Sequence, residues 1–349
     1  MAYSSITKPS LHFNTKLYSG TGSSNAITGI GFQPDFVWIK KRNGTTQHAL
    51  FDALRGTGKY LESSSTAPDQ TDNNSLSTFG TDGFTVVSKN SVNTNGDTYV
   101  SWNWKANGAG SANTDGSINT VSTSVNTTAG FSISKFTGTG SAATVGHGLG
   151  AVPKMYIVKN ITTNSLQWRV YHASLGATKN MALDATQAVG TASSVFNDTE
   201  PTSSVFSVGT DDAANKSGNS LIAYCFAEKT GYSKFGSYVG NGNADGTFVY
   251  TGFKPAFVMT KAYSGSSATS AWSIVDTKRA NSYNPQQRLF PNTSDAESAT
   301  GVFDLLSNGF KLVSGATTNN ASSTNYIYMA FAEEPLVANV GASIPATAR

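Results

Sequence analysis

Four short sequence blocks recur three times in the same order along the 349 residues of the chain. The second block begins with a proline and ends with a lysine six positions later each time, and the fourth is an alternating, aromatic-rich strand that closes the repeat. The proline precedes the last aromatic residue of the fourth block by 70, 73 and 76 positions. Blocks that keep their order and spacing in this way predict a triplicated structural unit of roughly 100 residues.

The other two blocks are less regular. The first is an aromatic residue followed by a Gly-x-Gly turn, and the third is a looser apolar stretch. In block order the repeats are residues 18–22, 34–40, 48–52 and 99–104; residues 136–140, 153–159, 168–172 and 221–226; and residues 238–242, 255–261, 272–276 and 326–331.

These blocks divide the chain into three units and shorter connecting segments. A Gly/Ser/Asn-rich stretch separates the first unit from the second, and linkers of that composition are flexible. The second and third units abut near Gly231. We expect a β-sandwich repeat 1 with an N-terminal arm at 1–107, a linker at 108–129, repeat 2 at 130–231, repeat 3 at 232–335 and a C-terminal tail at 336–349. The tail is either without fixed structure or an arm that docks on a neighbouring subunit.

The residue pattern within each unit favours strands. In the fourth block Val100, Trp102 and Trp104 share one face, and this alternation predicts a half-buried strand. The proline-led block is apolar on both faces, which predicts a central strand whose terminal lysine reaches solvent. The five tryptophans fall in these strand blocks and are expected in the core; they are Trp38, Trp102, Trp104, Trp168 and Trp272.

Helix is expected to be minor. Ser, Thr and Asn make up about a third of the chain, and these residues disfavour helix interiors. Each unit instead offers several short strands separated by turn signals such as Asp82-Gly83 and Asn308-Gly309. The sequence therefore predicts an all-β protein of three tandem jelly-roll or lectin-like β-sandwich repeats.

The sequence contains no readable catalytic constellation. Asp52 and Asp276 occupy equivalent positions, but His172 replaces them in the second unit, so no unit offers the carboxylate pair of a glycosidase. The chain also has no Gly-x-Ser-x-Gly nucleophile elbow. We expect a protein that is not an enzyme, and we assign no catalytic and no cofactor-binding residues.

Metal binding has one partial candidate. Residues 241–246 place Asn and Asp oxygens at alternate positions before a glycine, as in half of a calcium loop, but Gly252 stands where the bidentate Glu would be. We assign no metal ligand and leave calcium at this turn open. The single cysteine, Cys225, lies in an apolar run, which predicts a buried, inert thiol and excludes an intrachain disulfide.

Charge and hydropathy restrict the partners. A net charge of +3 without clustered basic residues does not predict nucleic-acid binding, and the absence of an 18-residue apolar run predicts no membrane insertion. The first residues lack the charged and apolar regions of a signal peptide, which suits a protein made in a cytoplasm and released by lysis. Tyrosines in variable loops are the candidate surface-contact residues, because exposed tyrosine is common at interfaces; they are Tyr60, Tyr263 and Tyr283.

The repeat blocks resemble a known kind of protein. The aromatic Gly-x-Gly turn, the Gly-Phe-x-Pro-x-Phe-Val strand at 31–37 and 252–258, and Tyr-x-x-x-Ala-Phe-Ala-Glu at 326–333 are similar to repeat domains in structural proteins of marine tailed bacteriophages, of the tail-fibre or appendage type. The resemblance covers about 90% of the chain. Unit 1 departs from it with Trp102-Asn103-Trp104-Lys105 at the end of its last block.

This resemblance implies a virion structural protein that is synthesised in the host cytoplasm and acts by assembly and host-surface binding. Its expected partners are other virion proteins, further copies of itself, with a trimer as the expected form, and a host-surface glycan. A capsid decoration protein of the head is the alternative within this class. A glycan-binding lectin or a depolymerase-like enzyme is the alternative of another class.

Overall fold

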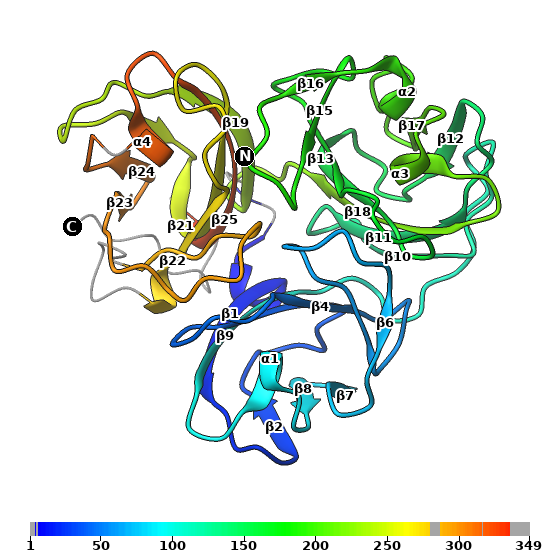
Figure 1. The fold of residues 1–349 in the computed structure, drawn as a ribbon, viewed down its shortest axis with the longest axis horizontal. Helices are drawn as coiled ribbons and strands as arrows, with labels where there is room; N and C mark the ends of the chain where they lie inside the picture. The colour runs from blue at the N-terminus through cyan, green and yellow to red at the C-terminus, as the bar shows by residue number, and fades with distance from the viewer. Residues whose placement is uncertain (1–3, 5, 280–286, 316, 336–349) are drawn as a thin grey trace.

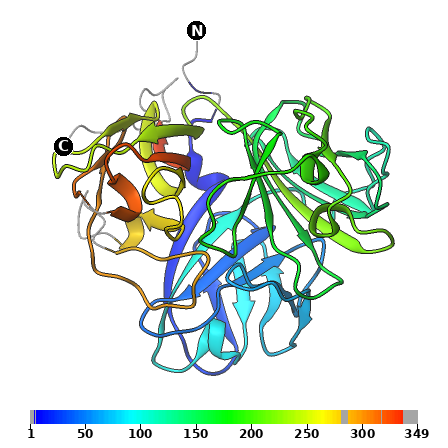
Figure 2. The same cartoon turned by 45° about the horizontal axis from the view of Figure 1, so that its top comes forward.

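The computed structural model describes residues 4, 6–279, 287–315 and 317–335. It confirms the all-β prediction, because the described α-helices are four single turns and the other regular elements are strands and two short 3-10 helices. Three lobes surround a common centre (Figure 1), and the turned view in Figure 2 shows the same arrangement. No described helix has the length and apolar character that a membrane crossing requires.

Each lobe corresponds to one of the repeats. Unit 1 contains, after η1 (Pro9–Leu11), β1 (Phe13–Ser19), β2 (Asn25–Thr28), β3 (Phe36–Lys41), β4 (Ala49–Asp52), β5 (Lys59–Tyr60), β6 (Gln70–Thr71), β7 (Leu76–Gly80), β8 (Gly83–Val86), α1 (Asn90–Asn93) and β9 (Thr98–Trp104). Unit 2 contains β10 (Ser122–Asn126), β11 (Phe131–Thr137), β12 (Ala143–Gly146), β13 (Pro153–Asn160), β14 (Arg169–His172), β15 (Lys179–Ala182), β16 (Gly190–Thr191), α2 (Ser193–Phe196), β17 (Val205–Val208), α3 (Asp212–Asn215) and β18 (Ser220–Ala227). Unit 3 contains β19 (Ser233–Val239), β20 (Phe248–Tyr250), β21 (Phe253–Ser264), β22 (Ser273–Asp276), η2 (Thr277–Arg279), β23 (Phe303–Leu306), β24 (Gly309–Leu312), α4 (Thr317–Asn320) and β25 (Asn325–Pro335).

The same antiparallel strand order recurs in each unit. An inner sheet has the order β1-β9-β3-β4 in unit 1, β11-β18-β13-β14 in unit 2 and β19-β25-β21-β22 in unit 3. A smaller outer sheet pairs β2 with β8, β12 with β17 and β20 with β24. In every unit the proline-led strand lies beside the closing strand, as its two apolar faces predict. Each unit is therefore a two-sheet sandwich.

The closing strands β9, β18 and β25 are buried on both faces, not on one. In β18, Leu221, Ala223 and Cys225 pack inside the sandwich of unit 2. Ile222 and Tyr224 point the other way, into a core that all three units share. The alternation therefore separates two cores rather than core from solvent, and the half-buried prediction is wrong because a neighbouring unit occupies the solvent side.

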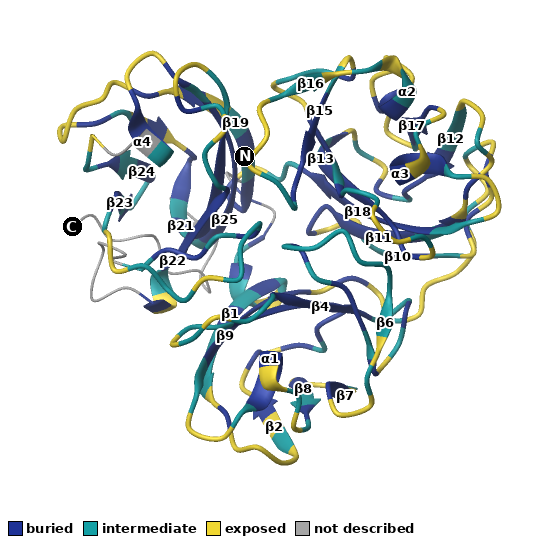
Figure 3. Cartoon of the chain, in the orientation of Figure 1, coloured by how far each residue is buried: buried dark blue, intermediate teal, exposed yellow. Residues whose placement is uncertain are grey.

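The shared core is aromatic and lies where the three inner sheets meet. One aromatic side chain from each closing strand forms a triangle at its centre, with ring centroids 6.3 Å apart for Trp104–Phe226, 5.7 Å for Trp104–Phe331 and 6.0 Å for Phe226–Phe331. All five tryptophans are buried and belong to this shared core, as the sequence predicts for their burial. Figure 3 shows buried strands toward the centre and exposed loops at the rim.

The Gly-x-Gly turns are held by a buried asparagine. Asn93, Asn215 and Asn320 end the one-turn helices α1, α3 and α4 and are fully buried. In each unit the side-chain oxygen accepts a hydrogen bond from the backbone N–H between the two glycines, at 2.9 to 3.0 Å. A Cβ at Gly20 would lie 2.1 Å from the carbonyl oxygen of Thr94, so this close approach requires glycine.

The segment expected to be a flexible linker, 108–129, contains a strand. β10 pairs with β11 over five residues, from Ser122 with Lys135 to Asn126 with Phe131. Thr123 and Ser124 are buried, and Val125 is partly buried against the core of unit 2. The segment thus adds an edge strand to the inner sheet of unit 2.

The shared core makes a stability prediction. Replacing Trp104, which is 2% exposed and contacts aromatic rings from all three units, with alanine removes the side chain at the centre. We expect a loss of about 3 to 5 kcal/mol in the free energy of unfolding. Chemical denaturation followed by far-UV circular dichroism measures it.

The matched control is Val121→Ala, which truncates an apolar side chain that is 59% exposed. We expect this variant to differ from the wild type by less than about 0.5 kcal/mol. Equal losses in the two variants would contradict a core centred on Trp104.

Candidate functional site

Three buried lysines donate hydrogen bonds across the seams between units. Lys40, Lys159 and Lys261 are the last residues of the proline-led blocks, lie in β3, β13 and β21, and are fully buried. Their Nζ atoms donate to one carbonyl of another unit: Ser294 at 3.3 Å, Thr66 at 3.0 Å and Thr186 at 3.3 Å, respectively. Each also donates to carbonyls of its own unit. The prediction that these lysines reach solvent is wrong, because a loop of the neighbouring unit covers the strand end.

The residues that open the third block cross the same seams. Trp168 Nε1 donates to the carbonyls of Glu62 and Ser65 in unit 1, and Trp272 Nε1 donates to that of Ala182 in unit 2 at 2.9 Å. The loop of unit 1 thus covers unit 2, and the loop of unit 2 covers unit 3.

His48 makes the corresponding contact between units 1 and 3. Trp38 Nε1 donates to its Nδ1 at 2.8 Å, so the proton of the neutral ring is on Nε2, which donates to the carbonyl of Phe290 in unit 3 at 3.0 Å. Burial places the pKa of His48 well below its usual value, which keeps the ring neutral. A loop of unit 3 therefore covers unit 1, and the ring of three units is closed within one chain.

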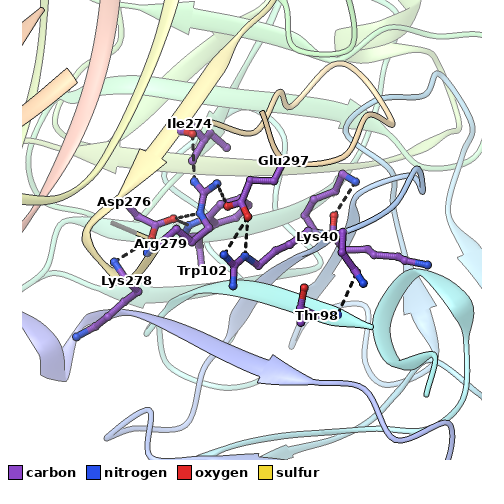
Figure 4. Close-up of polar contacts among 11 residues, drawn as sticks. Lys40, Thr98, Trp102, Ile274, Asp276, Lys278, Arg279 and Glu297 are labelled. Atoms are coloured by element: carbon purple, nitrogen blue, oxygen red, sulfur yellow. Dashed lines mark hydrogen bonds and ion pairs between the residues drawn. The ribbon is translucent and has the colours of Figure 1, made fainter. Parts of the chain in front are cut away.

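Two buried ion pairs lie in the third blocks. Arg55 Nε is 2.5 Å from Asp52 Oδ2, and Arg279 Nε is 2.6 Å from Asp276 Oδ2, with each of these side chains at most 1% exposed. A donor from another unit joins each carboxylate: Tyr224 Oη reaches Asp52 at 2.8 Å, and Trp102 Nε1 reaches Asp276 at 2.9 Å (Figure 4). Both aspartates are thus occupied by donors of the protein.

A carboxylate of unit 3 connects the second pair to unit 1. Glu297 accepts from Arg279 Nη1 at 2.9 Å and from Arg42 Nε at 2.9 Å, so one carboxylate bridges two units (Figure 4). In unit 2, His172 takes the place of the aspartates. Its Nε2 lies 3.1 Å from the carbonyl of Tyr328 in unit 3, and burial lowers its pKa to about 4.

A polar cleft with a volume of about 240 Å³ lies at the seam between units 1 and 3. Thr15, Lys278 and Glu333 line it. Thr15 is 5% exposed and its Oγ1 has no hydrogen-bond partner, whereas the equivalent strand positions of units 2 and 3 hold Ile133 and Phe235. The cleft exists where a small residue replaces a large one, and it can accommodate a small polar molecule.

Two of the three tyrosines predicted to be surface contacts lie within the described residues. Tyr60 is only 5% exposed, because it lies in β5 with its Oη donating to Gln70 and Lys89 over its ring, so the prediction of an exposed contact is wrong. Tyr263 lies in β21, partly buried against the shared core. Tyr283 lies outside the described residues.

Sequence reasoning missed two exposed aromatic residues on one short strand. Phe248 and Tyr250 of β20 are 45% and 54% exposed, with Val249 between them buried. An alignment of the three repeats could have identified them. The equivalent residues are Ala26 and Thr28 in unit 1 and Thr144 and Gly146 in unit 2, so these positions are aromatic in unit 3 alone.

The turn at 241–245 uses its oxygens internally. Asn241 Oδ1 accepts from the N–H of Asn243, and Asn243 Oδ1 accepts from that of Asp245, both at 3.0 Å. Lys311 pairs with Asp245 at 2.5 Å, which places a positive charge where calcium would sit. Nowhere in the described chain do three His, Cys, Asp or Glu side chains gather as a metal site would need. Cys225 is fully buried, as predicted, and burial raises its pKa.

The seam lysines predict a distinctive pH dependence of stability. Burial lowers the pKa of Lys40, Lys159 and Lys261 to about 8 in the folded protein, from 10.5. The unfolded chain therefore binds more protons between pH 8 and 10.5, so the free energy of unfolding rises with pH in that window. Below pH 8 the lysines are charged in both states and contribute no slope.

Other buried groups oppose this rise at higher pH. The raised pKa of Cys225 removes stability from about pH 9 upward, and those of buried tyrosines such as Tyr156 and Tyr224 remove it above pH 10. We expect maximal stability near pH 10, measured by denaturant unfolding at each pH. Lys159→Met should flatten the rise between pH 8 and 10. An unchanged slope in this variant would contradict the lysine assignment.

Breaking the buried Asp276–Arg279 ion pair is expected to cost more stability than breaking an exposed ion pair. Asp276→Asn leaves Arg279 buried with Glu297 as its one remaining carboxylate and should cost about 3 kcal/mol of unfolding free energy. Lys216→Met removes the exposed Lys216–Asp212 pair and should cost less than about 1 kcal/mol. Equal melting temperatures for the two variants would show that the seam pair is not structural.

Comparison with known proteins identifies a family without an assigned function. Its model, described as a domain of unknown function (DUF7483), matches residues 8–335. The match spans all three units, from just before η1 to the end of β25. No curated protein matches the chain.

Proposed function

We propose that this chain, which belongs to the DUF7483 family, is a phage virion structural protein of the tail-fibre or appendage type that acts by assembly and host-surface binding without catalysis. The repeat blocks that resemble virion repeat domains are the strands of the inner sheets and the turns between the sheets. The resemblance therefore rests on the parts of the chain that build the three-unit body.

The closed ring of three units is the observation that carries the proposal. The apolar faces of the inner sheets meet in one shared core, and the loop of each unit covers the next in one rotational direction. One chain is thus a preformed body of approximate threefold symmetry. Such a body suits a structural role, because assemblies are built from symmetric contacts.

The absence of free acid pairs among the described seam residues supports a role without catalysis. Asp52 and Asp276, the equivalent carboxylates of units 1 and 3, are each held by an arginine and by a donor from another unit. A general acid or base must be able to exchange a proton with a substrate, and these buried pairs are committed to holding the units together.

A capsid decoration protein of the head is the second candidate. The three-lobed outline around one centre supports this candidate, because a compact threefold body fits a threefold position of a lattice (Figure 1). Such a protein would occupy that position as one chain. Association of whole chains into a trimer remains a prediction.

A glycan ligand would be sought in the polar cleft. The tryptophans are buried in the shared core, so none of them is available to stack on a sugar. The cleft beside Thr15 and Lys278 offers polar groups of the kind that bind hydroxyls. A glycan array with the purified chain tests this part of the proposal separately.

The virion assignment is tested by locating the protein. Particles from cultures that produce the chain are purified by density gradient and labelled with antibody and gold. We expect the chain in the particle fractions, with label on tails for an appendage and on heads for a decoration protein. A chain that stays in the soluble fractions, with unlabelled particles, would overturn the proposal.

A further inference from the structure

One strand of the outer sheet differs between the units in what lies beside it. β2, β12 and β20 are equivalent, because each places one buried apolar residue opposite a phenylalanine of its partner strand. The pairs are Ile27 with Phe84, Val145 with Phe206, and Val249 with Phe310. The residues on either side of the buried one therefore also correspond.

In unit 2 the chain covers the free edge of this strand with an extended segment of its own. The N–H of Thr144 donates to Ser117 Oγ, and the N–H of Ile118 donates to the carbonyl of Thr144, both at 2.9 Å. Ile118 forms a parallel bridge with Val145 and is buried. This edge of the fold is thus able to accept an added strand.

In unit 3 the same edge is apolar and exposed. β20 ends the strand order β20-β24-β23 within the described residues, and Phe248 takes the place of Thr144. Phe248, Tyr250 and the adjacent Val239, whose carbonyl accepts from Thr247, are 45%, 54% and 53% exposed. Edge strands in native proteins are normally protected by charge, by proline or by a cover, and apolar exposure at an edge indicates a partner.

We propose that β20 is a strand-acceptor site and that its occupant is the C-terminal tail, residues 336–349. β25 ends at Pro335, which pairs with Phe253, only three residues after Tyr250. A strand advances about 3.3 Å per residue, so the separation between Phe253 and Tyr250 along the strand is about 10 Å, a distance that a few residues after Pro335 can span. The tail is 14 residues long and carries no charged residue before Arg349.

The tail also has the residue pattern of an added strand. Even-numbered positions from 336 to 344 are apolar, whereas the odd-numbered positions 339, 341 and 343 are Asn, Gly and Ser, with Val337 as the exception. Such an alternation presents one apolar face, which Phe248 and Tyr250 would meet. Main-chain hydrogen bonds supply the affinity in this mode of binding, and the side chains supply the specificity.

The size of the patch favours a strand over the body of a second copy. Stable interfaces between globular proteins bury about 800 Å² on each partner, which three partly exposed side chains do not offer. The inference concerns a binding site of the chain and does not depend on the virion assignment.

Hydrogen exchange on the full chain tests the site. The variant Phe248→Thr/Tyr250→Gly gives β20 the residues of β12. We expect tail amides 336–344 to exchange at least tenfold faster in this variant than in the wild type. Val152→Thr, which alters a valine that is 43% exposed outside the site, should leave them unchanged. Equal tail exchange in wild type and double variant would overturn the proposal.

Peptide binding tests the occupant. The full-length variant Val340→Asp/Ile344→Asp weakens the tail of the chain itself, and a labelled peptide of residues 336–349 is then added. We expect saturable binding in fluorescence anisotropy, at least tenfold weaker when Phe248→Thr is also present. A peptide with both Asp substitutions should not compete. Absence of binding, or binding unaffected by Phe248→Thr, would show that the tail is not the occupant.

Light scattering distinguishes the two sources of the tail. A wild-type monomer means that each chain binds its own tail. A wild-type oligomer that dissociates in the Val340→Asp/Ile344→Asp variant means that the tail binds the neighbouring copy. Either result keeps the tail as the occupant, whereas an oligomer that persists in the variant and shows no tail protection would assign the edge to another partner and overturn the proposal.

Discussion

The burial of the closing strands on both faces is the constraint on which the rest of the structure depends. β9, β18 and β25 each separate the core of their own sandwich from the shared core, so removing one unit would expose the inner faces of the other two. Trp104, Phe226 and Phe331 occupy equivalent positions in these strands, and each contacts the other two. Burial of apolar area stabilises by about 25 cal/mol per Å², so the apolar side chains of the shared core favour association of the units.

The polar groups at the seams give direction to an association that the hydrophobic effect alone would leave unspecified. Apolar burial is not directional, whereas a buried lysine must find acceptors at fixed positions. Lys40, Lys159 and Lys261 find them in the loop of the neighbouring unit, always in the same sense around the ring. A unit placed in the reverse order would leave each buried ammonium group without its acceptor in the neighbouring unit. The seams thus fix the order of the units, and the shared core supplies the stability.

Much of this architecture could be predicted from the sequence, because periodicity reports local burial well. The order of the blocks located the inner-sheet strands, and the strand blocks indicated the burial of the tryptophans. Periodicity does not report what lies on the far side of a strand, and for this reason Val100, Trp102 and Trp104 could be assigned to a core but not to a shared one. The same limit explains Lys40, since a lysine at a strand end is exposed unless another unit covers it. The prediction that Tyr60 is exposed was wrong for a related reason. Its burial depends on contacts with Gln70 and Lys89, which no local sequence pattern connects to it.

The departures from threefold repetition are the places where a specific partner can act. Positions that build the ring are similar in the three units, so any partner that recognised them would find three equivalent targets. Thr15 stands in place of Ile133 and Phe235 beside the cleft between units 1 and 3, and Phe248 in place of Ala26 and Thr144 makes a single edge apolar. Neither change serves the shared core, because one leaves a buried hydroxyl oxygen without a hydrogen-bond partner and the other exposes an aromatic ring to water. Features that reduce stability and break the repeat are best explained by binding of a specific partner. A perfectly symmetric ring would instead offer that partner three equivalent sites.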